Sequence, residues 1–312
     1  MTLRLTVDTE SWRANVDHVA RHCPGLVPVV KGNGYGFGRA ELVRIAARLA
    51  DTIAFGTVHE LDHVPAGITP VVLTPSWQPP TDLAPILTVG SVAHIRALAG
   101  WRGRVLVKLA SSVRRFGSTI EELGAVTAAA RAGGLDIVGF SVHPPVAGTD
   151  DEHLDDIAAW LGVLADDDEI WVSHLSPSAY DDLIDGWPER RFRIRIGTRL
   201  WHGDKRALHL DADVLDVRPV RAGEHAGYRQ QVVAVDGSIV MVGAGTAHGI
   251  RPLDDGRSPF HFDRQRLALL EPPHMHSSMV IVPAGQVGPR EGDRVDVQRP
   301  LITVFPDEVV WA

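Results

Sequence analysis

The sequence VPVVKGNGYGFGR, residues 27–39, joins a short apolar run to a loop with glycine at every second position. An apolar run that ends in turn-forming residues predicts a short buried strand. Lys31 therefore stands at the carboxyl end of this strand, where α/β proteins assemble their active sites. Partial burial at such a place lowers the pKa of a lysine and makes its neutral amine available as a nucleophile.

The alternating glycines Gly32, Gly34, Gly36 and Gly38 allow the backbone to approach a ligand closely. Their spacing matches neither the P-loop pattern nor the GxGxxG dinucleotide turn. The alternative interpretation is a lysine that extends its charged end into solvent before a flexible loop.

Length and composition describe an ordinary globular chain. Its 312 residues suffice for one large and one smaller domain, with 45% hydrophobic and 22% charged residues. The net charge of −8 argues against nucleic acid and anionic membranes as partners.

The compartment is inferred from what the sequence lacks. Cys23 is the single cysteine, which excludes an intrachain disulfide and fits a reducing environment. No apolar run is long enough for a membrane span, and the N-terminus lacks the features of a secretory signal. We therefore expect a cytoplasmic protein.

Short apolar runs alternate with helical stretches through the first two thirds of the chain. The runs cover residues 27–30, 53–57, 70–74, 85–89, 104–109, 137–142, 170–174 and 192–196. Helices are expected at 10–21, 39–50, 59–63, 91–99, 119–132 and 151–164, and from Ser178. Eight such units predict a parallel (β/α)8 TIM-like barrel over residues 1–205, with a doubly wound sheet as the alternative.

The rhythm changes after about Leu200, and short alternating segments predict a smaller β-rich C-terminal domain over residues 206–312. Strands are expected at 207–220, 228–235, 239–243, 266–270, 279–282, 294–297 and 301–305. The Asp236-Gly237 pair predicts a hairpin between the second and third of these.

The segment VVKGNGYGFG resembles the VVKANAYGHG segment of alanine racemases, which are fold-type III pyridoxal-phosphate enzymes. The resemblance implies that Lys31 carries pyridoxal 5'-phosphate as a Schiff base and that Tyr35 contacts the phosphate. It extends over roughly residues 2–298.

The segment VLVKLASSVRRFG is similar to the family's LKVDTGMGRIG. Lys108 aligns with a lysine that is often carbamylated, and Arg115 with an arginine that bonds the cofactor's phenolic oxygen. The central DTGM of the family is replaced here by residues 110–113, and both basic side chains would otherwise be interpreted as solvated.

Two further segments match in part. His143 in GFSVHPP resembles the histidine of the family's THFA segment, which lies against the cofactor ring; a lone histidine is otherwise a packing residue. Ser178 in VSHLSPSAY resembles the serine of HAANSAA, which bonds the phosphate. A serine that opens a helix favours a phosphate there, although an ordinary N-cap is the alternative.

Arg195 in RIRIGTRLWHG resembles the arginine of the family's RPGIALYG, which faces the pyridine nitrogen. A permanently charged guanidinium would keep that nitrogen unprotonated and weaken the ring as an electron sink. Gly197 and Thr198 would offer backbone amides to the phosphate. Alternating arginines could otherwise form a polar strand face.

This chain departs from the family at the position of the second catalytic base. Where the family has a catalytic tyrosine from the partner subunit, in GYADGY, this chain has Thr246 in GAGTAHGI. A threonine hydroxyl is a poor general base, so His248 or His276 are the alternatives. The chain also stops at Ala312, before the family's late GTINYE tyrosine.

Three functions follow from the resemblance. The first is an amino-acid racemase with catalytic residues Lys31, Thr246 and His248, acting on a small amino acid in a homodimer with a shared active site. The second is a D-amino-acid lyase whose metal would bind His274 and His276, although two ligands predict no metal site by themselves. The third is a cofactor-binding protein without turnover.

Overall fold

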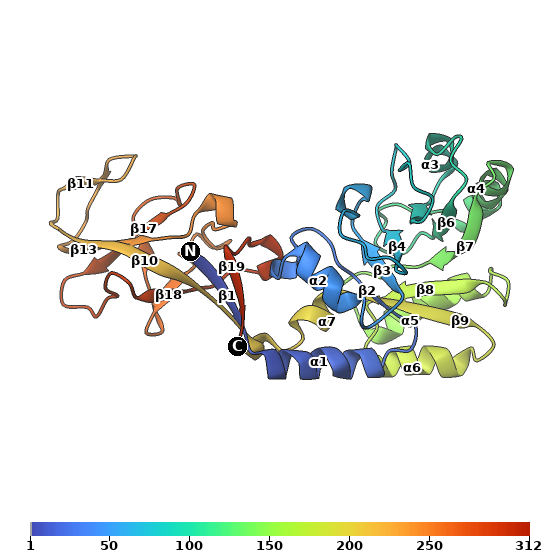
Figure 1. The fold of residues 1–312 in the computed structure, drawn as a ribbon, viewed down its shortest axis with the longest axis horizontal. Coiled ribbons are helices and arrows are strands. Elements are labelled where there is room, and N and C mark those ends of the chain that lie inside the picture. The colour runs from blue at the N-terminus through green and yellow to red at the C-terminus, as the bar shows by residue number, and fades with distance from the viewer. Residues whose placement is uncertain (1) are drawn as a thin grey trace. The chain divides into compact units, whose positions relative to one another are not determined.

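The computed structural model describes residues 2–312 and consists of two compact units. The barrel unit comprises residues 15–32 and 39–203, and the sheet domain comprises residues 2–14, 33–38 and 204–312. Figure 1 shows the path of the chain through these units. Each unit has its own hydrophobic core. No helix among the described residues is both long and apolar enough to cross a bilayer.

The barrel unit holds eight parallel strands in the order β2-β9-β8-β7-β6-β5-β4-β3 among the described residues. They are β2 (Leu26–Pro28), β3 (Thr52–Phe55), β4 (Thr69–Val72), β5 (Ile86–Val89), β6 (Arg104–Lys108), β7 (Asp136–Ser141), β8 (Glu169–Ser173) and β9 (Arg191–Ile196). A parallel bridge between Val29 and Ala54 joins the two ends of this order. The predicted (β/α)8 barrel is therefore confirmed, and the doubly wound sheet is wrong because such a sheet stays open.

Inward-facing side chains fill the barrel as a packed core. Its members are Val27, Val29, Ala54, Val71, Ile86, Leu106 and Trp171. Successive side chains of a strand point to opposite faces. Lys108 and Ser173, two residues beyond Leu106 and Trp171, therefore point into the barrel at the carboxyl ends of β6 and β8.

The helices begin close to the positions expected from the sequence, except α7, which was not predicted. They are α1 (Thr9–Arg21), α2 (Arg39–Ala46), α3 (Val92–Ala97), α4 (Ile120–Ala132), α5 (Asp150–Leu161), α6 (Pro177–Gly186) and α7 (Thr198–His202). Capping boxes at Thr119 and Thr149 fix the starts of α4 and α5. The helix predicted at 59–63 is instead a single 3-10 turn, η2 (Val58–Glu60).

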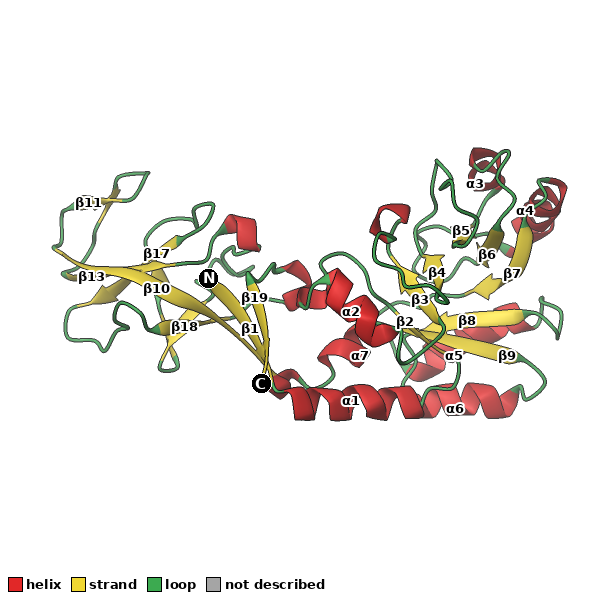
Figure 2. Ribbon diagram, in the orientation of Figure 1, coloured by secondary structure: helices red, strands yellow, loops and turns green. Residues whose placement is uncertain are grey.

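Strands and loops make up most of the sheet domain (Figure 2). Among the described residues one nine-stranded sheet runs β15-β14-β18-β10-β13-β17-β16, with β1 joined to β10 and β19 joined to β1. Its strands are β1 (Leu3–Val7), β10 (Leu208–Val220), β13 (Gly237–Val242), β14 (Phe260–Phe262), β15 (Gln265–Arg266), β16 (Ala268–Leu269), β17 (Ser278–Pro283), β18 (Arg294–Val297) and β19 (Glu308–Trp311). A separate ribbon pairs β11 (His225–Ala226) with β12 (Gln231–Val232).

The first strand belongs to the sheet domain and not to the barrel. It pairs antiparallel with β10, where Leu5 faces Leu210, and parallel with β19, where Leu5 faces Val309. The linear division at residue 205 placed β1 with the barrel, and β19 was not predicted. Backbone pairing over so long a sequence separation leaves no signal in the sequence of β1.

Two further expectations for the sheet domain are wrong. Asp236-Gly237 does not close a hairpin, because β12 pairs with β11 whereas β13 pairs with β10 and β17. The strand expected at 301–305 is instead the 3-10 turn η5 (Leu301–Thr303). The Asn33 side chain donates hydrogen bonds to the carbonyls of Leu301 and Val304, at 2.7 and 2.6 Å, which occupies that backbone.

Residues 33–38 pack within the sheet domain through an aromatic cluster. The ring of Phe37 lies 5.4 Å from that of Trp12 and 5.8 Å from that of Trp311. All four alternating glycines from Gly32 to Gly38 have positive φ, the left-handed conformation that glycine adopts at little cost. Tyr35 shares it at φ 57°, although it carries a side chain.

Candidate active site

The carboxyl ends of neighbouring barrel strands bring basic groups together. Lys31 follows β2, Arg195 lies in β9, His143 follows β7 and Lys108 ends β6. These four strands lie within the run β2-β9-β8-β7-β6 around the barrel, in which only β8 supplies none of the four residues. The predicted residues of the barrel therefore lie along one arc of its mouth.

Lys31 is solvent-accessible, yet its surroundings favour the neutral amine. Burial by the barrel wall lowers the pKa of Lys31 most, followed by the charge of Arg115, while Glu60 opposes the change. The Glu60 carboxylate is held by the backbone amides of Gly32 and Gly56, at 3.2 and 2.8 Å. Glu60 was not among the residues predicted for the site.

Lys108 is a buried amine without a partner. Its side chain is 5% exposed, and Nζ makes no hydrogen bond within residues 2–312. Burial, then the charges of Arg195 and Arg115, lower its pKa to about 6. Ser141, which faces Lys108 in the β6–β7 register, is also fully buried with an unpaired hydroxyl.

Arg195 is buried and bonds only to backbone carbonyls. Its Nη2 donates to the Val142 oxygen at 2.7 Å and its Nε to the Val172 oxygen at 3.4 Å. Burial, then Arg115, lower its pKa to about 10, so it stays charged at neutral pH. No carboxylate pairs with it in the described part of the chain.

His143 is held by a serine and a second histidine. Its Nδ1 lies 2.5 Å from the hydroxyl of Ser173, and its ring centre lies 4.5 Å from that of His174. Burial, then the charge of Arg195, lower its pKa to about 2, so the ring is neutral. His174, with φ 63°, donates from Nδ1 to the Pro144 oxygen at 2.9 Å.

Sequence reasoning missed Ser173 and His174 because their partner lies on the neighbouring strand. The alternation along β8 places Ser173 on the same face as Trp171, and this was the available signal. The partner of Ser173 becomes evident only once β7 and β8 are known to be adjacent.

Arg115 lies in a tight loop, residues 110–118. The loop returns to β6 through hydrogen bonds from Ser118 N to the Lys108 oxygen and from Ala110 N to the Ser118 oxygen, both 2.8 Å. Gly117 has φ 147°, and a side chain there would meet the Leu109 backbone at 2.6 Å. The exposed Arg115 guanidinium stacks over the Phe116 ring.

The predicted phosphate ligands lie at two helix starts. Ser178 does not open α6, since Ser176 caps the helix by accepting from Ala179 N at 3.2 Å. Ser178 follows in the first turn, exposed, with its hydroxyl 3.0 Å from that of Ser176. Gly197 precedes α7, and Thr198 begins it.

The remaining predicted residues belong to the sheet domain. Tyr35 is buried in the 3-10 turn η1 (Gly34–Gly36), and Thr246 is exposed in η4 (Thr246–His248). His248 is buried, and both of its ring nitrogens are occupied. Nδ1 accepts from Gly245 N at 3.1 Å and Nε2 lies 3.3 Å from an Asp307 oxygen, which are the contacts of a packing residue.

The histidine pair considered as metal ligands is divided. The His274 Nε2 is bonded to the buried carboxylate of Glu271, whereas His276 is exposed. Within residues 2–312 no group of three histidine, cysteine or acidic side chains is arranged to hold a metal ion.

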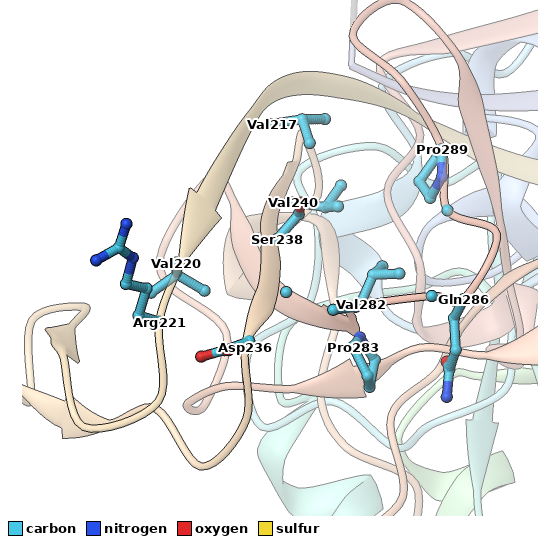
Figure 3. A pocket seen from close by; sticks show the side chains of 14 residues that line it. Val217, Val220, Arg221, Asp236, Ser238, Val240, Val282, Pro283, Gln286 and Pro289 are labelled. Carbon is cyan, nitrogen blue, oxygen red and sulfur yellow. The ribbon is translucent and has the colours of Figure 1, made fainter.

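A hollow on the sheet domain contains none of the predicted residues (Figure 3). Valines of β10, β13 and β17 line it, including Val220, Val240 and Val282. Figure 3 shows the guanidinium of Arg221 turned outward, away from the other labelled side chains. The convergent basic groups are at the barrel mouth and not here.

The barrel mouth fits an anionic group that reacts with an amine. The charges of Arg115 and Arg195 lower the pKa of both Lys31 and Lys108 there, and Lys108 Nζ is buried without a partner within residues 2–312. Pyridoxal 5'-phosphate has a phosphate, a phenolic oxygen and an aldehyde, which suit cations and a neutral lysine.

A parallel barrel with a lysine after its first strand, followed by a β-rich domain, defines a class of two-domain enzymes. The family model "Alanine racemase, N-terminal domain" matches residues 7–200, which is more than half of the chain. The chain belongs to the alanine racemase family.

Solved structures share the whole architecture. Alanine racemase from Bartonella henselae, with covalently bound pyridoxal phosphate, is 16% identical with a TM-score of 0.75, over 100% of both chains. The Bacillus anthracis enzyme with bound L-Ala-P is 21% identical with a TM-score of 0.75, over 95% of this chain and 85% of that one. The enzyme of Streptomyces lavendulae is 20% identical with a TM-score of 0.69, over 100% of this chain and 97% of that one. No curated protein sequence matched the chain.

Proposed function

We propose that this protein is a pyridoxal-phosphate-dependent amino-acid racemase-like enzyme that moves a proton at the α-carbon of a small amino acid. The observation that carries the proposal is the buried Arg195 guanidinium, which bonds only to backbone carbonyls and lies near two lysines whose pKa values are lowered. Family membership supports the same cofactor.

We propose that each of these barrel residues contacts a different part of the cofactor. When bound as a Schiff base on Lys31, pyridoxal phosphate supplies an electron sink that acidifies the α-hydrogen of an amino acid. Arg195 would present a fixed charge to the pyridine nitrogen, and Arg115 would present one to the phenolic oxygen. His143, which is neutral and bonded to Ser173, would lie against the ring.

The phosphate would be held by short polar groups and amides. We propose Ser178, the amides of Gly197 and Thr198, and the hydroxyl of Tyr35 for this task. Lys31 then holds or releases the α-proton on one face of the substrate, because burial, followed by the charge of Arg115, lowers the pKa of its amine.

On the opposite face the family position is occupied by Thr246, whose exposed hydroxyl is a weak acid. His248 would have to leave Asp307 or Gly245 before it moved a proton. The arrangement favours a contribution of Thr246 and His248 to pocket shape over direct proton transfer.

Trapping with borohydride tests the covalent assignment. The chain contains three lysines, Lys31, Lys108 and Lys205, so mass spectrometry of the reduced protein identifies the one that carries the cofactor. We expect the label on Lys31 and loss of the visible cofactor band in Lys31→Ala. Lys205→Ala is the matched control, because Lys205 is exposed and remote in sequence from the mouth.

Turnover is measured with the same protein in deuterium oxide with L- and D-amino acids. Exchange of the α-proton with inversion supports a racemase. Release of pyruvate or an aldehyde would instead identify the lyase, and a cofactor band without exchange would identify a carrier. A label on Lys108 in the trapping experiment would overturn the assignment of Lys31.

We further propose a cytoplasmic homodimer in which the sheet domain of one subunit completes the barrel mouth of the other. The proposal extends the architecture of the family to this chain. Its substrate is a small-molecule amino acid; neither nucleic acid nor membrane is a partner, as the net charge of −8 disfavours both.

A further inference from the structure

The loop of residues 110–118 is tied to helix α5 at two points. Asp156 and Trp160 lie four positions apart on this helix and therefore on one of its faces. The Asp156 carboxylate accepts from the Ser112 hydroxyl at 2.6 Å and from the Ser112 backbone amide at 3.2 Å. The indole of Trp160, which is 5% exposed, donates to the Ala110 oxygen at 2.7 Å. One face of α5 thus holds the first part of the loop.

A third contact ties the same loop to the barrel. The Ser111 hydroxyl donates to the backbone oxygen of His143, beyond the end of β7, at 2.7 Å. The backbone amide of Arg114 donates to the Ser111 oxygen at 3.0 Å and closes a turn. Arg114 has φ 52°, a left-handed conformation that is costly for a residue with a side chain. Such a conformation persists where the surrounding contacts determine the backbone, as they do in this loop.

The direction of the Arg115 guanidinium depends on this backbone. Arg115 makes no hydrogen bond or ion pair with its side chain in the described part of the chain, and it lies over the Phe116 ring, 4.8 Å from the ring centre. Burial lowers the pKa of Lys31 and of Lys108 most, and the charge of Arg115 lowers both further. The loop therefore presents a cation to the barrel mouth that no other charged side chain orients.

The contacts lie where this chain differs from the family segment LKVDTGMGRIG. Ser111 and Ser112 belong to residues 110–113, which replace DTGM. Asp156 and Trp160 lie in α5, outside the segments on which the resemblance rests. The way in which the loop is held is therefore a property of this chain.

We propose that Asp156 and Ser112 are positioning residues that hold Arg115 where it meets the phenolic oxygen of the cofactor. The inference rests on the proposed function, in which Arg115 contacts that oxygen. Asp156 fixes Ser112 through two hydrogen bonds, and Arg115 follows Ser112 three positions later. Neither Asp156 nor Ser112 has to touch the cofactor, so their effect on binding passes through Arg115.

The main test compares two ligands in equilibrium titrations of the cofactor-free protein. They are pyridoxal 5'-phosphate and its 3-deoxy analogue, which lacks the phenolic oxygen. Asp156→Ala should weaken the binding of pyridoxal 5'-phosphate by about tenfold, the size expected when a hydrogen bond to a charged group is lost. Its affinity for the analogue should equal that of the unmodified protein. A contact that served only the fold would weaken both ligands equally.

Three further variants control this comparison. Ser112→Ala removes one of the two hydrogen bonds and should give the same pattern to a smaller extent, and it replaces Asp156→Ala if that variant does not fold. Ser112→Thr keeps the hydroxyl and should bind as the unmodified protein does. Asp155→Ala removes an exposed carboxylate from the same helix and should leave both affinities unchanged.

A double variant tests whether the effect passes through Arg115. Arg115→Ala by itself should weaken the binding of pyridoxal 5'-phosphate by about tenfold or more. Adding Asp156→Ala should then cost little further affinity, because residues that act through one contact are not additive. Additive losses would show that Asp156 acts elsewhere and would overturn the proposal.

Limited proteolysis reports the loop without any ligand. Trypsin cleaves after arginine, so Arg114 and Arg115 are the sites at which opening of the loop is measured. Asp156→Ala should raise the rate of cleavage there by about tenfold, whereas Asp155→Ala should keep the rate of the unmodified protein. An unchanged rate in Asp156→Ala would overturn the anchoring of the loop.

The outcomes separate this inference from the proposed function. Equal losses for both ligands in Asp156→Ala, or no loss for either, overturn the role of Asp156 and leave the assignment of Lys31 standing. An unchanged affinity in Arg115→Ala also overturns the inference alone. Failure of the unmodified protein to bind pyridoxal 5'-phosphate overturns the proposed function and this inference together.

Discussion

The buried amine of Lys108 carries a large electrostatic cost in the barrel. The unfolded chain protonates it at about the ordinary value of 10.5, and the folded chain at about 6. Between these values the unfolded state binds one more proton, so the stability of the cofactor-free protein rises with pH across that window. Below about pH 6 both states are protonated and the dependence ends.

Replacing this amine by a neutral side chain of similar length should stabilise the cofactor-free protein. At pH 7 we expect Lys108→Met to raise the free energy of unfolding by roughly 2–4 kcal/mol. The gain should shrink near pH 9.5, where less of the unfolded chain is protonated. Urea denaturation at both pH values measures it, and an equal gain at both would contradict the pKa assigned to Lys108.

At the residue scale the sequence predicted the groups that carry charge. Lys31, Lys108 and Arg195 each end or follow an apolar run, and the resemblance to the family then selected them as site residues. Glu60 and Ser173 were missed, because what defines them is a partner on another segment, Gly56 or His143. Such partners become visible only after the strand order is known.

At the scale of the element, two serines at the start of α6 have different roles: Ser176 stabilises the helix, and Ser178 is proposed to bind phosphate. Ser176 accepts a backbone hydrogen bond, whereas Ser178 points outward from the first turn. Ser176→Ala should lower the free energy of unfolding by about 1 kcal/mol, and Ser178→Ala should leave it nearly unchanged.

Thermal denaturation of both variants measures the difference in their stability. Isothermal titration with inorganic phosphate compares their affinity for phosphate. Weaker phosphate binding by Ser178→Ala is expected from its proposed role. Equal stability losses in the two variants would contradict Ser176 as the N-cap.

The barrel strands could be predicted because each is a continuous apolar run, as expected of strands buried on both faces. The strands of the sheet domain were harder to predict from the sequence. β11, β12, β15 and β16 have two residues each, too few for a pattern, and η5 owes its shape to hydrogen bonds from Asn33. The Asp236-Gly237 turn was detected, but its strands pair with others.

At the scale of the whole molecule, the proposed shared site makes assembly part of function. Sedimentation equilibrium at micromolar concentration should give twice the 33.8 kDa mass of the chain. A protein that stays monomeric at that concentration, with or without pyridoxal phosphate, would contradict the homodimer.

The place of residues 3–7 in the fold could not be predicted from the sequence. Local patterns describe each strand but not its partner, so nothing in the sequence indicated that β1 pairs with β10. The pairing of β1 with β19 links residues at opposite ends of the chain, and no periodicity reports it.

That pairing sets an order of events during synthesis. Thr2 donates to the Asp307 carboxylate, a partner 305 positions later, so the first strand leaves the ribosome long before its neighbour exists. All eight strands of the barrel emerge in the interval. The leading segment can pair with β10 once residue 212 has emerged, but its other edge stays unpaired, and therefore open to chaperones and to mispairing, until residues 308–311 have emerged.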